Sequence, residues 1–339
     1  MARKQQSIPQ GRLVILEHTS KVLAGNALGD PHVRKLPVWL PPQYDAGKGR
    51  AGDRRFPVLY DLVGFTGSGL AHVNWRPFDE NVTERVARLV HERRMGPAIV
   101  VFPDCFTSLG GNQYINSSAI GRYADYLTRE IIPFVDREFR TLASRDHRGC
   151  FGKSSGGYGS IIHAMRYPEY WGAIADHSGD ANFNLCYLTD WPRTLDELDH
   201  YRARRRRAGR VDAARDAKLA ADGRDDGRVA RFLDAMWSKE KLSDAEMHAI
   251  MEIAMAASYD PDPRAPNGFR LPFNLETGEL LPQRWKRWLE HDPVMLVGRY
   301  AANLRRMRGI YIDCGWRDQY HLHYGARLLS KRLAEHRIE

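Results

Sequence analysis

Short apolar runs alternate along most of the chain with longer segments in which apolar residues recur at helical spacing. Runs that are continuous rather than alternating with polar positions are typical of strands buried on both faces of a parallel sheet. The longer segments carry one apolar stripe, which predicts helices that cover such a sheet. The pattern predicts strands at residues 12–17, 33–40, 57–63, 97–102, 148–151, 171–175 and 309–314, and helices at 83–95, 120–139 (with a kink at Pro133), 155–165, 296–307 and 322–336.

The alternation stops between residues 183 and 291. This segment is charged, contains helical stretches and becomes rich in proline toward its end. It is too long to be a loop in a compact domain, and we interpret it as an inserted helical cap. The predicted organisation is an α/β core in two parts, residues 1–182 and 292–339, with the cap at 183–291 between them.

Most of the formal net charge of +9 lies in one segment. Residues 201–232 hold eleven Arg or Lys against five Asp, a net +6, so the rest of the chain carries +3. A local basic stretch is typical of a solvated face, so we expect it on the surface of the cap. Neutralising Arg204 to Arg207 is therefore expected to change turnover of a neutral ester little.

Other aspects of the composition narrow the class of protein. No apolar run approaches about 18 residues, which excludes a membrane-spanning helix, and the polar first ten residues do not resemble a signal peptide. We expect a cytoplasmic protein with a small-molecule substrate and with no nucleic-acid or membrane partner. No disulfide framework or zinc site is predicted, because no C-x-x-C spacing occurs among Cys105, Cys150, Cys186 and Cys314.

A serine lies between glycines at residues 152–156, which read Gly-Lys-Ser-Ser-Gly. This G-x-S-x-G pattern follows an apolar run and precedes a helix-like segment, as in a nucleophile elbow. The turn is cramped, so the residues two before and two after the serine must be small. The following helix directs N–H groups and the positive end of its dipole toward the serine. The motif predicts that Ser154 is the nucleophile of a serine hydrolase.

Five segments around this motif resemble an esterase family of the α/β-hydrolases, which includes S-formylglutathione hydrolase, feruloyl esterases, enterochelin esterases and mycolyltransferases. The resemblance covers roughly residues 30–182 and 292–339 and implies an α/β-hydrolase fold. The segments that carry it are Pro-Val-Leu-Tyr at 57–60, Ile-Val-Val-Phe-Pro-Asp at 99–104, Glu-Ile-Ile-Pro-Phe-Val-Asp at 130–136, the serine motif, and Asp-Cys-Gly-Trp-Arg-Asp at 313–318.

The resemblance implies a catalytic serine, acid and histidine in that chain order. Ser154 matches the serine, and Asp318 matches the acid because the family has Gly-x-x-Asp after a late strand. Asp313 is the competing acid but falls within the predicted strand. Asp318 also suits the N-cap of the last helix, and the two roles are compatible.

The resemblance also implies an oxyanion hole made by two backbone N–H groups. One is the N–H of Ser155, and the other is the N–H of Phe65 in the Gly-rich loop 63–69. The family usually has His-Gly at the start of this loop, and here the histidine is absent. The loop at 103–118 follows a strand and is expected to line the substrate site. His72, Trp75, Trp171 and His177 are further candidates near the site, for which a structural role is favoured.

The catalytic histidine of the family follows one more strand after the helix at 322–336. We therefore predict that these 339 residues lack the last strand, the histidine and the closing helix, as in a fragment or a catalytically impaired relative. His177 is the best substitute base within the chain. His336 lies at the far end of its helix, and His321 and His323 share one short segment with Asp318.

The predicted function is hydrolysis of a carboxylic ester through an acyl-enzyme, with no cofactor and no metal. Acyl transfer on the same residues and a binding protein without catalysis stay open as alternatives. A P-loop is disfavoured, because His147 replaces the first glycine that the motif would need before Gly152. The Ser-x-x-Lys sequence at Ser238 has no Lys-Thr-Gly partner, and the group Asp318, His321 and His323 is too closely spaced for a metal site.

Overall fold

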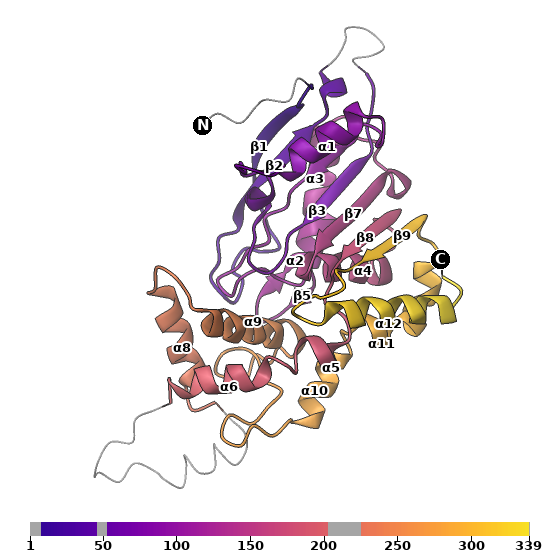
Figure 1. Ribbon diagram of the computed structural model, residues 1–339. Coiled ribbons are helices and arrows are strands. Elements are labelled where there is room, and N and C mark those ends of the chain that lie inside the picture. Colours follow the sequence, from indigo (N-terminus) through magenta and orange to yellow (C-terminus); the bar gives the residue numbers. More distant parts are fainter. Residues whose placement is uncertain (1–7, 46–52, 203–224, 339) are drawn as a thin grey trace, which may run out of the picture.

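The computed structural model describes residues 8–45, 53–202 and 225–338, and these residues form one seven-stranded sheet with helices on both faces (Figure 1). Five neighbouring strands are parallel to one another. At one edge two further strands follow, each paired antiparallel to its neighbour. The order across the sheet is β1-β2-β4-β3-β7-β8-β9. The strands are β1 (Arg12–Thr19), β2 (Val33–Leu40), β3 (Val58–Leu62), β4 (Ile99–Val101), β7 (Arg148–Lys153), β8 (Ala173–His177) and β9 (Gly309–Asp313).

Successive apolar residues of the central strands pack on opposite faces of the sheet. Val38, Ile99 and Val101 belong to the large core, whereas Trp39 and Val100 pack on the opposite face. The helix α1 (Val82–His91) covers the Trp39 face. The large core is covered by α3 (Ile132–Glu138), α4 (Ser155–Arg166), α11 (Pro293–Leu304) and α12 (Leu322–Glu335). The predicted mostly parallel sheet with helices on both faces is confirmed.

The long amphipathic segment at 120–139 forms a helical stretch of changing pitch. A short α2 (Tyr123–Asp125) leads into a π-helical turn, Tyr126–Ile131, and then into α3. Pro133 has no N–H and cannot donate an ordinary intrahelical bond, and the Ile132 N–H bonds instead to the Leu127 carbonyl five residues back. A π-helical turn thus directly precedes α3, which contains Pro133, and the sequence analysis did not predict this widening.

Most of the segment 183–291 that the structure describes is helical and gathers at one end of the sheet (Figure 1). The helix α9 packs against α6, and twelve of its sixteen residues are buried. Residues 204–207 of the basic stretch lie outside the described residues. The nearby Arg228 is buried and paired with Asp226. The helices of this segment are α5 (Phe183–Cys186), α6 (Trp191–Asp199), α8 (Arg228–Trp237), α9 (Asp244–Tyr259) and α10 (Pro282–Leu289).

Candidate active site

Ser154 lies on the turn between β7 and α4, in a backbone conformation that non-glycine residues rarely adopt. Its φ is 58° and its ψ is −123°. Two hydrogen bonds hold this conformation: the Ser154 N–H donates to the His177 carbonyl at 3.0 Å, and the Ser154 carbonyl accepts from the Tyr158 N–H at 2.9 Å. Such strain persists where the surroundings over-determine it, and it is common at active sites.

The glycines two residues before and after Ser154 allow the turn to pack against β3. A Cβ on Gly152 would lie 2.2 Å from the Leu62 carbonyl oxygen, and a Cβ on Gly156 would lie 1.8 Å from the same atom. Neither distance is sterically possible. The two glycines are therefore required by the close approach of the elbow to the neighbouring strand, as the motif predicts.

Ser154 opens into a cavity of about 460 Å³ between the sheet and the helical segment 183–291. The loop after β3 forms one wall, and the segment leading into α12 forms another. The third wall comes from α9, which contributes Met247, His248 and Met251. A cleft of this size, lined by polar and apolar side chains in similar measure, can hold a small ligand. Other lining residues are Phe65, Thr66, His72, Arg76, Lys153, Asp180, Tyr187, Asp318 and Tyr320.

Behind the nucleophile lies a buried polar network centred on Asp180. The Ser154 hydroxyl is 3.5 Å from Asp180 Oδ1, and the Tyr187 hydroxyl donates to Asp180 Oδ2 at 3.0 Å. Gln113 Nε2 lies 2.8 Å from the Ser155 hydroxyl and 3.3 Å from Asp180 Oδ2. Gln113 comes from the loop at 103–118, so within the described chain this loop supports the elbow from behind instead of lining the cavity.

Sequence reasoning missed Asp180 and Gln113 as site residues. Asp180 follows β8 in a Ser-Gly-Asp turn, and Gln113 is one polar residue in a long loop. A polar residue directly after a buried parallel strand was the available signal for Asp180, because such positions meet at the carboxyl edge of the sheet. Burial raises the pKa of Asp180 to about 6, against the hydrogen bonds from Tyr187 and Gln113 that lower it.

Asp176 in β8 is a second buried carboxyl below the elbow. Its Oδ1 has no hydrogen-bond partner within the described residues, and burial raises the pKa of Asp176 to about 7. The folded protein therefore holds this proton more tightly than the unfolded chain. The stability gained in this way is complete below about pH 4 and is lost as the pH rises through about 7.

Asp176→Asn is expected to remove this pH dependence. Relative to the wild type, the free energy of unfolding of the variant should rise by on the order of 1 to 3 kcal/mol between about pH 5 and pH 8. Urea denaturation of both proteins at the two pH values measures the difference. An equal difference at both pH values would contradict a raised pKa.

The loop after β3 lies directly against the elbow. A Cβ built on Gly64 would lie 3.4 Å from the Ser154 Cβ. The Phe65 side chain is buried, and its carbonyl accepts from the Gly111 N–H at 2.6 Å, which fixes the loop. The Phe65 N–H donates to no acceptor within the described residues. Ser155 is the first residue of α4, where helix N–H groups have no intrahelical partner.

Asp318 lines the same cavity and lies four residues before Leu322, the first residue of α12. Its Oδ1 accepts from the N–H of Tyr320 at 2.9 Å and from the N–H of Leu322 at 3.2 Å. The N-cap of α12 is His321, so the predicted N-cap role of Asp318 is wrong, and Asp318 contacts the start of the helix only through these two hydrogen bonds. Asp313, the competing acid, is bonded at 2.8 Å to His177 Nδ1.

The structure does not place His177 at the cavity. His177 and Asp313 are register partners at the ends of β8 and β9, and neither is among the described residues that line the cavity. Within the described chain, Ser154 Oγ bonds to Asp180 and to no histidine. In the same part of the chain β9 is the edge strand of the sheet.

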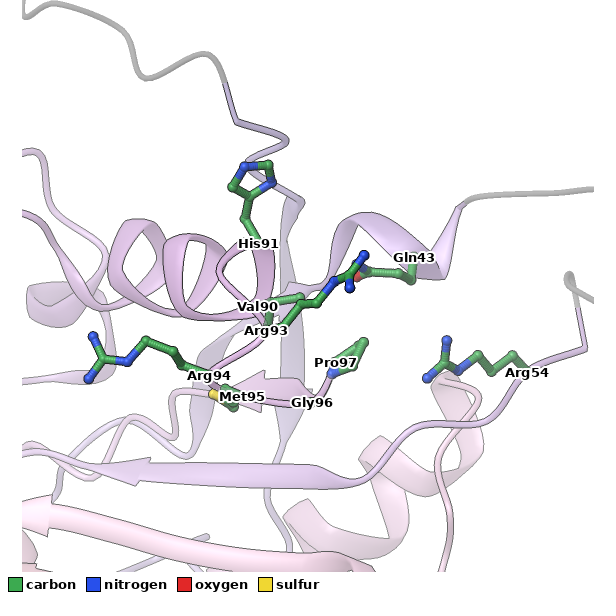
Figure 2. A pocket seen from close by; sticks show the side chains of 9 residues that line it. All are labelled: Gln43, Arg54, Val90, His91, Arg93, Arg94, Met95, Gly96 and Pro97. Atoms are coloured by element: carbon green, nitrogen blue, oxygen red, sulfur yellow. The ribbon is translucent and has the colours of Figure 1, made fainter.

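A second cavity, of about 570 Å³, lies at the amino end of β4, where α1 ends and β4 begins (Figure 2). Three of its nine lining residues are arginines, and Figure 2 shows Arg94 directed away from Arg93 and Arg54. None of the described residues that line it is a serine, threonine or cysteine nucleophile. Ligands of parallel α/β sheets bind at the carboxyl ends of the strands, so Ser154 marks the candidate active site.

A family model described as "Putative esterase" matches residues 31–338. The chain belongs to this esterase family. Its relatives hydrolyse esters, and the fold with the elbow and the two-faced helical cover is that of an α/β-hydrolase. In the part of the chain that the structure describes, no helix is both long and apolar enough to cross a membrane.

Two curated relatives are named esterases. Esterase Rv1288 of Mycobacterium tuberculosis is 31% identical over 152 residues, which are 43% of this chain and 29% of the relative. An endo-1,4-beta-xylanase/feruloyl esterase of Xylanibacter ruminicola is 30% identical over 142 residues, 41% of this chain and 19% of the relative. The matches thus span less than a third of either relative.

Solved structures show the same fold across nearly the whole chain. A ferulic acid esterase superposes with a TM-score of 0.54 at 16% identity, covering 97% of this chain and 88% of the other. The S-formylglutathione hydrolase of Staphylococcus aureus gives 0.51 at 15% identity with the same coverage. The fluorophosphonate-binding serine hydrolase FphF of Staphylococcus aureus gives 0.53 at 15% identity, again covering 97% and 88%.

Proposed function

We propose that this chain hydrolyses carboxylic esters of small molecules through an acyl-enzyme formed on Ser154. The observation that carries the proposal is the strained strand-to-helix turn that directs Ser154 into the cavity. A buried hydroxyl with only structural partners needs no such conformation, whereas an attacking oxygen must project from the end of the sheet. Membership of an esterase family gives ester hydrolysis as the reaction class.

The proposed chemistry uses groups that surround the cavity. Ser154 Oγ attacks the ester carbonyl carbon and loses its proton to a base, the alcohol leaves with a proton, and water then releases the acid. The N–H groups of Phe65 and Ser155 stabilise the oxyanion. Within the described residues, the Phe65 N–H has no backbone acceptor, and the Ser155 N–H lies in the first turn of α4, where N–H groups have no intrahelical partner. Both observations support this assignment. Asp318 is proposed as the acid of the triad because it lines the same cavity.

The proton acceptor that the sequence predicts lies outside the described lining of the cavity. His177 was expected as the substitute base, and its Nδ1 is bonded to a carboxylate, as the role requires. The imidazole lies on β8 next to β9, beyond the residues that line the cavity. His177 therefore stays a prediction, and its use would require a movement that brings Nε2 to Ser154.

A fluorophosphonate probe tests the proposed function directly. Ser154 Oγ is expected to displace fluoride from phosphorus and to form one stable adduct for each chain, because the probe requires an activated nucleophile. Mass spectrometry of the intact protein gives the stoichiometry, and peptide mapping locates the adduct. Heat-denatured protein is the control and should not react. An adduct on a residue other than Ser154, or none on the folded chain, would contradict the proposal.

A further inference from the structure

Three methionines at helical spacing follow one side of the buried helix α9: Met247, Met251 and Met255. Residues four apart in a helix lie one above the other, about 6 Å apart along the axis. The first two line the cavity of the nucleophile. Met255 is buried, and its Sδ lies 3.0 Å from Gln113 Nε2 and 3.4 Å from the Tyr187 hydroxyl. These three side chains, the methionine row, therefore run from the network behind the nucleophile along the wall of the cavity.

Two side chains of the methionine row stay accessible in a helix that is otherwise buried. From Glu246 to Tyr259, every residue of α9 is buried except Met247 and Met251. Apolar surface that stays accessible in such a setting is typical of a ligand-binding groove. The space that these two side chains line is the Ser154 cavity, so the ligand that would cover them is the substrate of that serine.

Two buried side chains, Tyr187 and Leu322, add further apolar surface to the lining of the cavity. The polar residue that α9 contributes is His248. Its Nδ1 lies 2.9 Å from Asp190 Oδ2, and its Nε2 lies 3.6 Å from Asp244 Oδ1. Both ring nitrogens therefore face carboxylates of the protein, and what α9 offers to a ligand is mainly the thioether and methylene surface of its methionines.

Two cationic side chains of the lining come from other elements and are exposed. Arg76 follows the short helix η3 (Gly69–His72), and its side chain is 51% exposed. Lys153, at the end of β7, is exposed as well. The chain leading to Arg76 is tied to β3, because His72 Nδ1 lies 2.6 Å from the buried Asp61 Oδ2. Exposed cations belong where water solvates them, so they mark the open side of the cavity, whereas α9 forms the enclosed side.

We propose that the methionine row binds the acyl group of the ester and that this acyl group is apolar, an inference that rests on the proposed function. The alcohol must leave, and water must reach the acyl carbon, from the side that opens to solvent. The acyl group stays bonded to Ser154 Oγ between these steps, so it occupies the enclosed side along α9. A charged acyl group would lose its hydration there. Methionine adapts to different shapes, so the substrate class is esters of uncharged, apolar carboxylic acids.

The test measures kcat/KM for p-nitrophenyl acetate, butyrate and hexanoate, which share one leaving group and differ in acyl length. Each methylene that is buried against the methionine row is expected to raise kcat/KM by about four-fold, the factor that corresponds to the burial of one CH₂. The butyrate should therefore exceed the acetate by on the order of 10-fold. Methyl, butyl and hexyl acetate vary the alcohol instead, and their kcat/KM values should differ little.

Met251→Gln keeps the length of the side chain and makes its end polar. This variant should lower the butyrate-to-acetate ratio of kcat/KM by on the order of 5-fold, whereas Met251→Leu, which stays apolar at similar volume, should keep the ratio. Met247→Gln should lower the hexanoate-to-acetate ratio, because Met247 lies one turn farther from the network behind the nucleophile. Met295→Gln is the matched control and should keep both ratios, because Met295 is exposed on α11 and is not among the described residues of the lining.

An equal butyrate-to-acetate ratio in the wild type and in Met251→Gln overturns the proposal, and so does a rise of kcat/KM that is confined to the alcohol series. If Met251→Gln unfolds early in a thermal scan, Met247→Gln decides, since an unchanged hexanoate-to-acetate ratio there equally overturns the proposal. Calorimetry with Ser154→Ala separates the inference from the proposed function. Tighter binding of the hexanoate than of the acetate, without turnover by the wild type, would reject the proposed function and leave the apolar surface in place.

Discussion

Ser154→Ala is expected to abolish turnover of p-nitrophenyl acetate, with kcat falling by on the order of 10⁶-fold. The variant loses the attacking oxygen but keeps a Cβ at a backbone position with a φ of 58°. Its backbone strain is therefore unchanged, and the free energy of unfolding should stay within about 1 kcal/mol of the wild type. Steady-state kinetics and urea denaturation measure the two quantities.

Ser238→Ala is the matched control for this substitution. Ser238 begins the Ser-x-x-Lys sequence that offered a rival nucleophile, and its exposed hydroxyl donates to the Ala235 carbonyl at 2.7 Å. Its substitution should leave kcat unchanged. Wild-type turnover in Ser154→Ala would refute the assignment of the nucleophile, and loss of turnover in Ser238→Ala would point to the rival.

Gly156→Ala is expected to have the largest effect on folding. The new Cβ would lie 1.8 Å from the Leu62 carbonyl oxygen, an atom of the central strand β3 that cannot turn aside as a side chain can. Either α4 or β3 must shift, so the free energy of unfolding should fall by more than about 3 kcal/mol. Ester hydrolysis should fall with it, because α4 carries the Ser155 N–H.

Gly96→Ala is the control for the glycine substitution. A Cβ at Gly96 would meet no atom within 4 Å, so this variant should be as stable as the wild type. Denaturation in urea followed by fluorescence compares the three proteins. A Gly156→Ala protein of unchanged stability would show that the elbow does not pack against β3 as described.

The sequence predicted those parts of the fold whose structure depends on residues close together in the chain. The buried parallel strands read as continuous apolar runs because both of their faces are covered, and the elbow has a motif because sterics at Gly152 and Gly156 leave no choice of residue. The helix pitch at 126–131 could not be read in the same way. Proline excludes a hydrogen bond, but the sequence does not say whether the helix bends or widens in response.

The site was predicted less completely, because its residues meet through tertiary packing. Gln113 and Asp180 are 67 positions apart and converge only when the strand order is known. Met247 and Met251 lie on a helix whose apolar residues indicate burial, and nothing in their spacing shows that one side of α9 faces a cavity. The pairing of His72 with Asp61 likewise depends on how a loop folds back over β3.

The network behind Ser154 bears on how this protein can be engineered. Asp180 belongs to the core, yet its Tyr187 partner and the adjoining Tyr259 hydroxyl, 3.2 Å from that of Tyr187, come from the segment 183–291. The core and the segment 183–291 therefore share one buried hydrogen-bond network. Loss of the partners on one side would leave buried polar groups without hydrogen bonds and would destabilise the fold. A segment grafted from a relative would have to bring its own donor for Asp180. An exchange of the helical segment between relatives would therefore have to include the buried polar residues behind Ser154.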